Sequence, residues 1–123
     1  MVSPDEINIE NMTRWIEALE SGEYPQDPRG GALKTSDGYC CLGVLCELDG
    51  VHWVEHPVMS NQRRIFTTED GLMGLPSSQR MRRFLGIEGQ TVLAQGVGVM
   101  NDNGKTFAEI AQALRTEFNI PKA

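Results

Sequence analysis

The stretch "GYCCLGVLCEL", residues Gly38–Leu48, decides the fold at the centre of the chain. It follows a Ser-Asp-Gly turn signal, and two structures compete for it. A strand continuing a hairpin would alternate its side chains between two faces, whereas a helix would gather its cysteine and leucine side chains on one side. We expect strand geometry at Tyr39–Cys40 that turns into a helix by Leu42. Gly43 costs a helix roughly 1 kcal/mol relative to Ala, so we expect another backbone to approach it closely.

The same stretch holds the three cysteines of the chain, Cys40, Cys41 and Cys46. Adjacent cysteines rarely bridge each other and the number is odd, so free thiols in a reducing compartment fit best. A thiol at a helix N-terminus, with His52 or His56 as its base, would make the chain a cysteine-dependent hydrolase, which stays an alternative. Because free cysteine is among the most buried residue types, we expect these thiols to serve as packing.

Amphipathic helices are expected near both ends of the chain. The first is predicted to start at "SPDE", Ser3–Glu6, a cap followed by proline and two acids, and to end at Gly22. The second is predicted to start at a capping box of Thr106 and Glu109, after a turn at Asn101–Gly104. Apolar residues follow helical spacing in both: Met12, Trp15, Ile16 and Leu19, then Phe107, Ile110, Ala111, Leu114 and Phe118.

Short elements are expected between these helices. Strand patterns cover Ala32–Thr35, Val51–His56 and the first part of Arg63–Gly71. A short helix is expected within Leu75–Gly86, capped by Ser77 and stopped by its final glycine. No element is predicted for the glycine-rich segment Glu88–Met100. We therefore predict an α+β fold: a compact single domain, residues 1–123, with N- and C-terminal amphipathic helices packed on a small antiparallel sheet.

Composition and charge exclude several classes of protein. Of the 123 residues, 40% are hydrophobic and 23% charged, which argues against a disordered chain. No apolar run approaches the roughly 20 residues needed to span a bilayer, and the N-terminus lacks the pattern of a signal peptide. A net charge of −6 argues against nonspecific binding to nucleic acid. We expect a cytoplasmic protein that binds no membrane.

A metal site would have to use Cys41, Cys46, His52 and His56. These residues lack the paired spacing of structural zinc sites, and adjacent cysteines make awkward ligands. The glycines before Asn101 match neither of the common phosphate-binding loop patterns. We expect no metal and no cofactor.

Arginines form the only basic clusters, at Arg63-Arg64 and at Arg80, Arg82 and Arg83. Such clusters are usually solvated faces, but they keep open a second alternative, a DNA-binding regulator. A helix-turn-helix would need two adjacent helices with a short turn, and no segment immediately before Leu75 is predicted to be helical. The acidic background also disfavours this alternative.

The chain resembles a widespread set of small proteins of phages and prophages. The matching segments, in order, are "WIEALESGEYPQ" (Trp15–Gln26), "GALK" (Gly31–Lys34), "DGYCCLGVLCEL" (Asp37–Leu48), "LPSSQRMRRFLGI" (Leu75–Ile87) and "NDNGKTFAEIA" (Asn101–Ala111). The cysteine block is the most specific of them. The resemblance implies an origin, a phage accessory gene product in a bacterial cytoplasm, and carries over no catalytic residue.

We therefore expect a non-enzymatic binding protein that acts on host defence or host physiology. It would hold either a host protein or a small phosphate-bearing, nucleotide-like ligand. The candidate contacts are the polar or aromatic residues that lie outside the helical core stripes: Trp53, Arg63, Arg64, Asn101 and Asn103. Trp53 is equally compatible with a place in the core. A homo-oligomer stays open, because a small chain can gain a second core by dimerising.

Overall fold

The computed structural model describes residues 7–27, 32–57, 64–86 and 90–122, with only the backbone for residues 90–95. Within these ranges the elements are α1 (Ile9–Ser21), β1 (Lys34–Thr35), β2 (Gly38–Tyr39), α2 (Cys41–Leu48), β3 (Val54–Glu55), β4 (Ile65–Thr67), α3 (Ser78–Leu85), α4 (Gln90–Asp102) and α5 (Phe107–Phe118). The strands form an antiparallel sheet in the order β2-β1-β4-β3. The predicted α+β class is confirmed.

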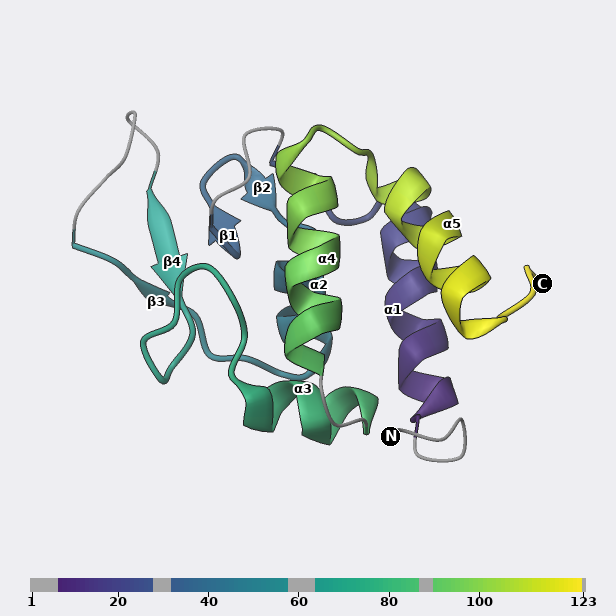
Figure 1. Cartoon of the computed structure of the whole chain (residues 1–123). Helices are drawn as coiled ribbons and strands as arrows, with labels where there is room; N and C mark the ends of the chain where they lie inside the picture. The colour runs from purple at the N-terminus through teal and green to yellow at the C-terminus, as the bar shows by residue number, and fades with distance from the viewer. Residues whose placement is uncertain (1–6, 28–31, 58–63, 87–89, 123) are drawn as a thin grey trace.

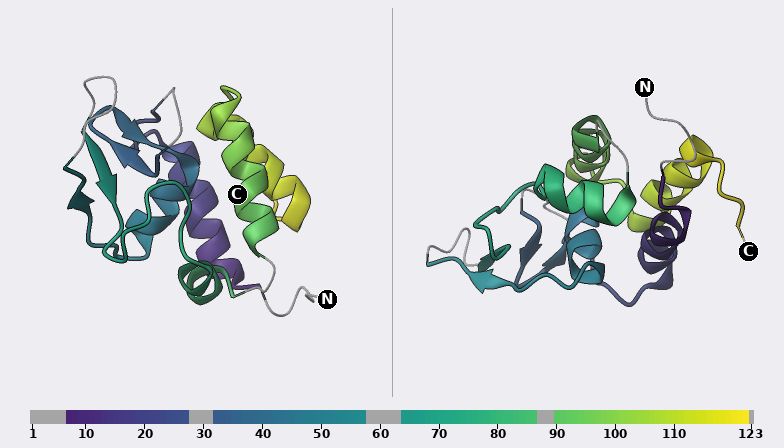
Figure 2. Two further views of the ribbon diagram at one scale, coloured as in Figure 1. Left: turned by 60° about the vertical axis from the view of Figure 1, so that its left-hand side comes forward. Right: turned by 90° about the horizontal axis from the view of Figure 1, so that it is seen from below.

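The sheet lies at one side of the molecule and the helices at the other (Figure 1). α1 and α5, near the two ends of the chain, pack against each other, as Figure 1 and the right-hand view of Figure 2 show. α2 contacts α1, α4 and strand β2, so it joins the sheet to the helical part. No helix within the described ranges has the length and apolar character needed to cross a bilayer.

The central stretch folds as its sequence predicts. β2 ends at Tyr39, Cys40 is the N-cap, and α2 starts at Cys41. The backbone that approaches Gly43 is that of Leu33, just before β1. A Cβ built on Gly43 would lie 1.8 Å from the carbonyl oxygen of Leu33, far inside any real contact distance. Helix α2 therefore requires glycine at position 43, where the chain leading into β1 crosses the helix.

Helix α2 is the most buried element of the fold. Its first six residues, from Cys41 to Cys46, are all buried. The indole N–H of Trp15 in α1 donates to the carbonyl oxygen of Cys41 over 2.9 Å. α4 lies against α2 from another side, where Val97 is buried. A short apolar helix of this kind is stable because its neighbours cover it, and not because of its own helix propensity.

The predicted start of the first helix is wrong. α1 begins at Ile9, and the side chain of Asn8 caps it by accepting from the backbone N–H of Asn11 over 2.9 Å. The predicted start, Ser3–Glu6, lies outside the described residues. Both patterns satisfy the rules for a helix cap, so local sequence did not decide between them. The predicted core residues of α1 are buried, and Gly22 ends the helix with φ of 77°.

The strands are shorter than predicted. Of Val51–His56, only Val54–Glu55 pairs in the sheet. The backbone N–H of Val51 donates instead to Cys46 at the end of α2, and the N–H of His52 donates to the Glu69 carboxylate. The other two strand segments shrink to Lys34–Thr35 and Ile65–Thr67.

The glycine-rich segment, for which the sequence predicts no element, contributes most of the helix α4. This helix extends through Asn101 and Asp102, so the predicted turn is confined to Asn103 and Gly104, the latter with φ of 85°. The two interior glycines of α4 weaken the local helix signal, and its packing on α2 compensates. α3 begins and ends as predicted, with the Ser77 cap and the αL glycine at 86, and α5 begins at its predicted capping box.

The two helical glycines Gly43 and Gly96 make a matched test of the α2 crossing. Gly43→Ala should lower the free energy of unfolding by at least about 3 kcal/mol, because the new methyl group overlaps backbone atoms. Gly96→Ala should raise it by up to about 1 kcal/mol, because a Cβ there meets no atom within 4 Å. Urea denaturation of both variants measures the difference. Equal midpoints for Gly43→Ala and the wild type would contradict the crossing.

Candidate functional site

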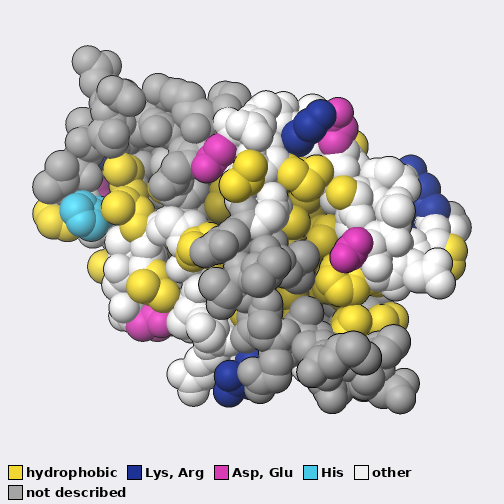
Figure 3. All heavy atoms as spheres, in the orientation of Figure 1, with side chains coloured by type: hydrophobic (Ala, Val, Ile, Leu, Met, Phe, Trp, Pro, Cys, Tyr) yellow, Lys and Arg dark blue, Asp and Glu magenta, His cyan; other side chains and the backbone are white. Residues whose placement is uncertain are grey.

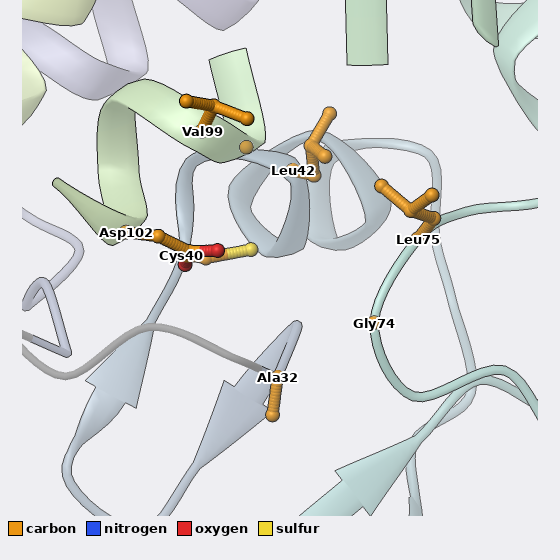
Figure 4. Close-up of a pocket in the computed structure, with 8 residues that line it drawn as sticks. Ala32, Cys40, Leu42, Gly74, Leu75, Val99 and Asp102 are labelled. Carbon is orange, nitrogen blue, oxygen red and sulfur yellow. The ribbon is translucent and has the colours of Figure 1, made fainter. Parts of the chain in front are cut away.

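A groove opens on the molecule where α4 passes the start of α2 (Figure 4). Its volume is about 410 Å³, within the usual size of small-ligand and side-chain pockets. We call it the α4 groove, and its lining residues are Ala32, Cys40, Leu42, Gly74, Leu75, Gly98, Val99 and Asp102.

Three walls form the α4 groove. Val99 and Asp102 project from α4, Leu42 lies on α2, and Gly74 and Leu75 belong to the loop before α3 (Figure 4). That loop is held by a hydrogen bond from the Leu33 N–H to the Met73 carbonyl oxygen over 2.7 Å. Leu33, which crosses α2 at Gly43, therefore also positions one wall of the groove.

The groove is apolar with an acidic end. Of its lining residues, Val99 is 58% exposed and Leu75 is 39% exposed. Met73, which precedes the lining residue Gly74, is also 39% exposed. Hydrophobic side chains gather across this face, and acidic side chains lie beside them (Figure 3). Asp102 supplies a carboxylate within the lining. The lining therefore suits an apolar group.

Its small residues leave room for close approach. A Cβ on Gly74 would meet nothing within 4 Å, and one on Gly98 would meet only a Leu42 methyl group, at 3.9 Å. Neither glycine has a left-handed φ, so the fold of the described chain does not require them. Glycine costs a helix roughly 1 kcal/mol, which makes Gly98 an unfavourable choice unless the space is used.

The cysteines are poor nucleophiles. Cys41 and Cys46 are fully buried and Cys40 is 6% exposed at the wall of the groove. Burial raises the pKa of Cys40 to about 11, that of Cys46 to about 12, and that of Cys41 well above its ordinary value. The Cys41 thiol donates to the Val97 carbonyl oxygen over 3.6 Å. The packing role predicted for the thiols accounts for all three side chains.

The side chain of Asn101 links α4 to the start of α2 and to Gln26. It is 1% exposed and so lies inside the fold, and whether it contacts a ligand or partner stays a prediction. Its Oδ1 accepts from the Cys41 backbone N–H over 3.3 Å and from Gln26 Nε2 over 3.2 Å. Gln26 also accepts from the Phe107 N–H and donates to the Lys105 carbonyl oxygen. Since the Cys40 side chain makes no cap, Asn101 caps α2 from α4 while Gln26 caps α5.

The other predicted contacts fall in two separate places. Trp53 and Arg64 lie at the sheet, where Arg64 pairs loosely with Glu55 at 3.7 Å. Trp53 is half-buried and packs against the edge of the core. Asn103 is exposed in the turn after α4. Arg63 lies outside the described residues, and whether any of these side chains binds a partner stays a prediction.

The second arginine cluster is only partly a solvated face. Arg80 is 6% exposed, and its guanidinium pairs with Asp49 at 3.0 Å and with Glu69. Arg83 pairs with the same Asp49 from an exposed position. α3 and α4 follow each other closely, as a helix-turn-helix would require, but α4 contains no Lys or Arg. Arg80 is thus a structural residue that fastens α3 to the end of α2.

Sequence reasoning missed most of the groove, although two signals pointed to it. Gly98 and Val99 lie in the segment for which no element is predicted, and the loop residues Gly74 and Leu75 carry no motif. The signals are glycines in a helix that does not need them and an apolar residue on its outer face. Within the described ranges, no group of three or more His, Cys, Asp or Glu is placed to hold a metal ion.

The fold and the groove define a small α+β domain built around one buried helix, with an open apolar surface beside it. The chain belongs to the family described as "Domain of unknown function (DUF8296)", whose model matches residues 7–118. That match covers every described helix and strand. No curated protein and no solved structure matches the chain.

Asn101 and Asn103 make a matched pair for testing whether the hydrogen bonds of Asn101 stabilise the fold. Asn101→Ala should lower the free energy of unfolding by about 2–3 kcal/mol, because the N–H of Cys41 loses its acceptor inside the protein. Asn103→Ala should change it by less than about 0.5 kcal/mol, since the residue is exposed. Thermal or urea denaturation distinguishes them. If the two variants lost similar amounts of unfolding free energy, the role of Asn101 as the cap of α2 would be contradicted.

Alkylation tests the state of the thiols. At pH 8 the folded protein should react with iodoacetamide at least about 100-fold more slowly than the urea-unfolded protein, because a pKa raised by about two units lowers the thiolate fraction that much. Mass spectrometry of the time course measures it. Native Cys40 or Cys41 labelling at the unfolded rate would contradict the packing role and revive the hydrolase.

The same pKa shifts predict the pH dependence of stability. The folded thiols have pKa values above those of the unfolded chain. Their contribution to the free energy of unfolding is therefore complete below the unfolded pKa of about 8.5. It declines as the pH rises from there toward about 11, the pKa of folded Cys40. Urea denaturation at a series of pH values measures the decline. A free energy of unfolding that stays constant over this range in the wild type would contradict the shifts.

Proposed function

We propose that this chain is a non-enzymatic binding protein of phage type that holds a host protein in the α4 groove. The observation that carries the proposal is an open apolar groove with Val99 58% exposed at its wall and a carboxylate, Asp102, at its end. Exposed apolar surface of this kind marks interaction sites on soluble domains. A role against host defence follows from the resemblance to phage proteins.

Charge selects the partner. The groove contains Asp102, and the chain carries a net charge of −6. A partner segment with an apolar side chain next to Lys or Arg would fill the groove and meet its acidic end. A second copy of this chain brings the same negative charge, which disfavours it as the occupant.

A phosphate-bearing ligand is less well supported. Among the residues that the structure describes, the lining of the α4 groove contains no Lys or Arg, and its one charged member is acidic. Arg64, one of the predicted contacts, lies at the sheet beside Glu55 and away from the groove. Titration calorimetry with nucleotides should therefore give no heat of binding, and a DNA mobility shift at low salt should show no complex.

Two exposed valines test the groove directly. Val99→Asp should weaken capture of the host partner at least about tenfold, because a carboxylate replaces apolar contact beside Asp102. Val54→Asp is the matched control, since Val54 is 46% exposed on the distant edge strand β3. The measurement is quantitative mass spectrometry of proteins captured from host lysate by the wild type and both variants.

The supporting result is a partner kept by Val54→Asp and lost by Val99→Asp. A partner kept equally by both variants, or lost equally by both, would contradict the proposal. Sedimentation of the purified chain tests whether a second copy of the chain occupies the groove. A dimer that Val99→Asp dissociates would assign the groove to a second copy and overturn the assignment to a host protein.

A further inference from the structure

A lysine and three aromatic side chains form a cluster on the sheet, and none of them lines the α4 groove. The ammonium nitrogen of Lys34 lies over three aromatic rings. It is 5.1 Å from the centre of Tyr39, 5.5 Å from that of Trp53 and 5.2 Å from that of Phe66. A cation within about 6 Å of a ring face is attracted by the ring quadrupole. Three rings around one ammonium group make an aromatic cage.

Strand register builds the cage. Lys34 in β1 pairs with Tyr39 in β2 and with Phe66 in β4, so the three side chains stand side by side on one face of the sheet. Trp53 joins them from the segment before β3. The opposite face carries the buried row, including Thr35 and Ile65. Lys34 and the three rings are each half-buried, so solvent reaches the cage.

One carboxylate fixes two of the three walls. Glu47 Oε1 accepts from the Tyr39 hydroxyl over 2.8 Å and from the Trp53 indole N–H over 3.0 Å. The two rings are thereby held 6.4 Å apart at 60° to each other. Burial and the neighbouring Glu47 raise the pKa of Tyr39, which keeps its hydroxyl a donor. Glu47 also adds negative charge behind the rings, which favours a cation in the cage.

We propose that Tyr39, Trp53 and Phe66 form a recognition site for a methylated alkylammonium group, and that Lys34 fills this site in the unbound protein. A primary ammonium is strongly hydrated, whereas a methylated one offers weakly hydrated surface to all three rings. The flexible four-carbon stem of Lys34 lets its head group leave. As a tethered competitor, Lys34 lowers the affinity for an external cation.

This site does not depend on the function proposed for the α4 groove, because it shares no residue with the lining of that groove. The sequence contained no signal for it. The rings come from three strands or strand flanks, and only the register brings them around Lys34. The predicted contact Trp53 is thus placed with aromatic neighbours that favour a cation.

The test is a fluorescence titration that reports on Trp53, with tetramethylammonium chloride as the probe and sodium chloride at equal ionic strength as the control. The wild type should give a saturable change. Lys34→Ala should bind the probe at least about tenfold more tightly, because the tethered competitor is gone. Adding Phe66→Ala to that variant should weaken binding at least about tenfold, and Phe66 lies outside the core cluster, so the fold persists.

A wild-type titration indistinguishable from sodium chloride overturns the proposal. Equal affinities of Lys34→Ala with and without Phe66→Ala also overturn it, and circular dichroism verifies that each variant is folded. A peptide with one trimethyllysine identifies the source of the group. Tighter binding than tetramethylammonium assigns it to a protein side chain, and equal binding assigns it to a small cation.

Discussion

The contact between the Gly43 backbone and the Leu33 carbonyl oxygen is the constraint on which the rest of the structure depends. It brings the chain leading into β1 against the buried helix α2 at a distance that no side chain at position 43 would permit. The same Leu33 accepts from the Cys40 N–H and donates to Met73. One crossing therefore sets the strand-to-helix junction, joins the sheet to the helices and positions the loop before α3.

The functional surfaces follow from that crossing on its two sides. On one side, the loop held by Leu33 faces α4 and leaves the apolar groove between them. On the other, β1 begins at Lys34, whose side chain lies among the three aromatic rings on the sheet. The three thiols lie at the centre of this arrangement, where burial raises their pKa values. The buried middle supports the fold, and the chemistry available for recognition lies at its edges.

Local signals predicted those elements whose ends are fixed by nearby residues. The Thr106–Glu109 capping box, the Ser77 cap and the glycine at 86 each act within one helical turn, so the sequence displays them directly. The close approach at Gly43 was also predictable from a local signal. Glycine is unfavourable inside a helix, so its presence in an apolar one indicates that another backbone packs against it.

The parts that depend on distant residues were not predictable. α4 has weak propensity and is stabilised by packing on α2, and its last residue but one caps that helix. The bond between Asn101 and Gln26 joins residues 75 positions apart, so no local pattern marks it. The strand ends and the cage around Lys34 require the register of the sheet. The groove walls require the packing of α4 on α2. All five predicted contacts stay predictions, and one of them, Arg63, lies outside the described residues.

Native-state amide hydrogen exchange tests the central position of α2 most directly. If the Gly43–Leu33 crossing holds the fold together, the α2 amides of Val44, Leu45 and Cys46 open only when the whole protein unfolds. Their exchange should then give the same free energy as urea denaturation and be the slowest in the chain. Exchange of these amides faster than those of α1 or α5, through a local opening that leaves the other helices protected, would contradict the account.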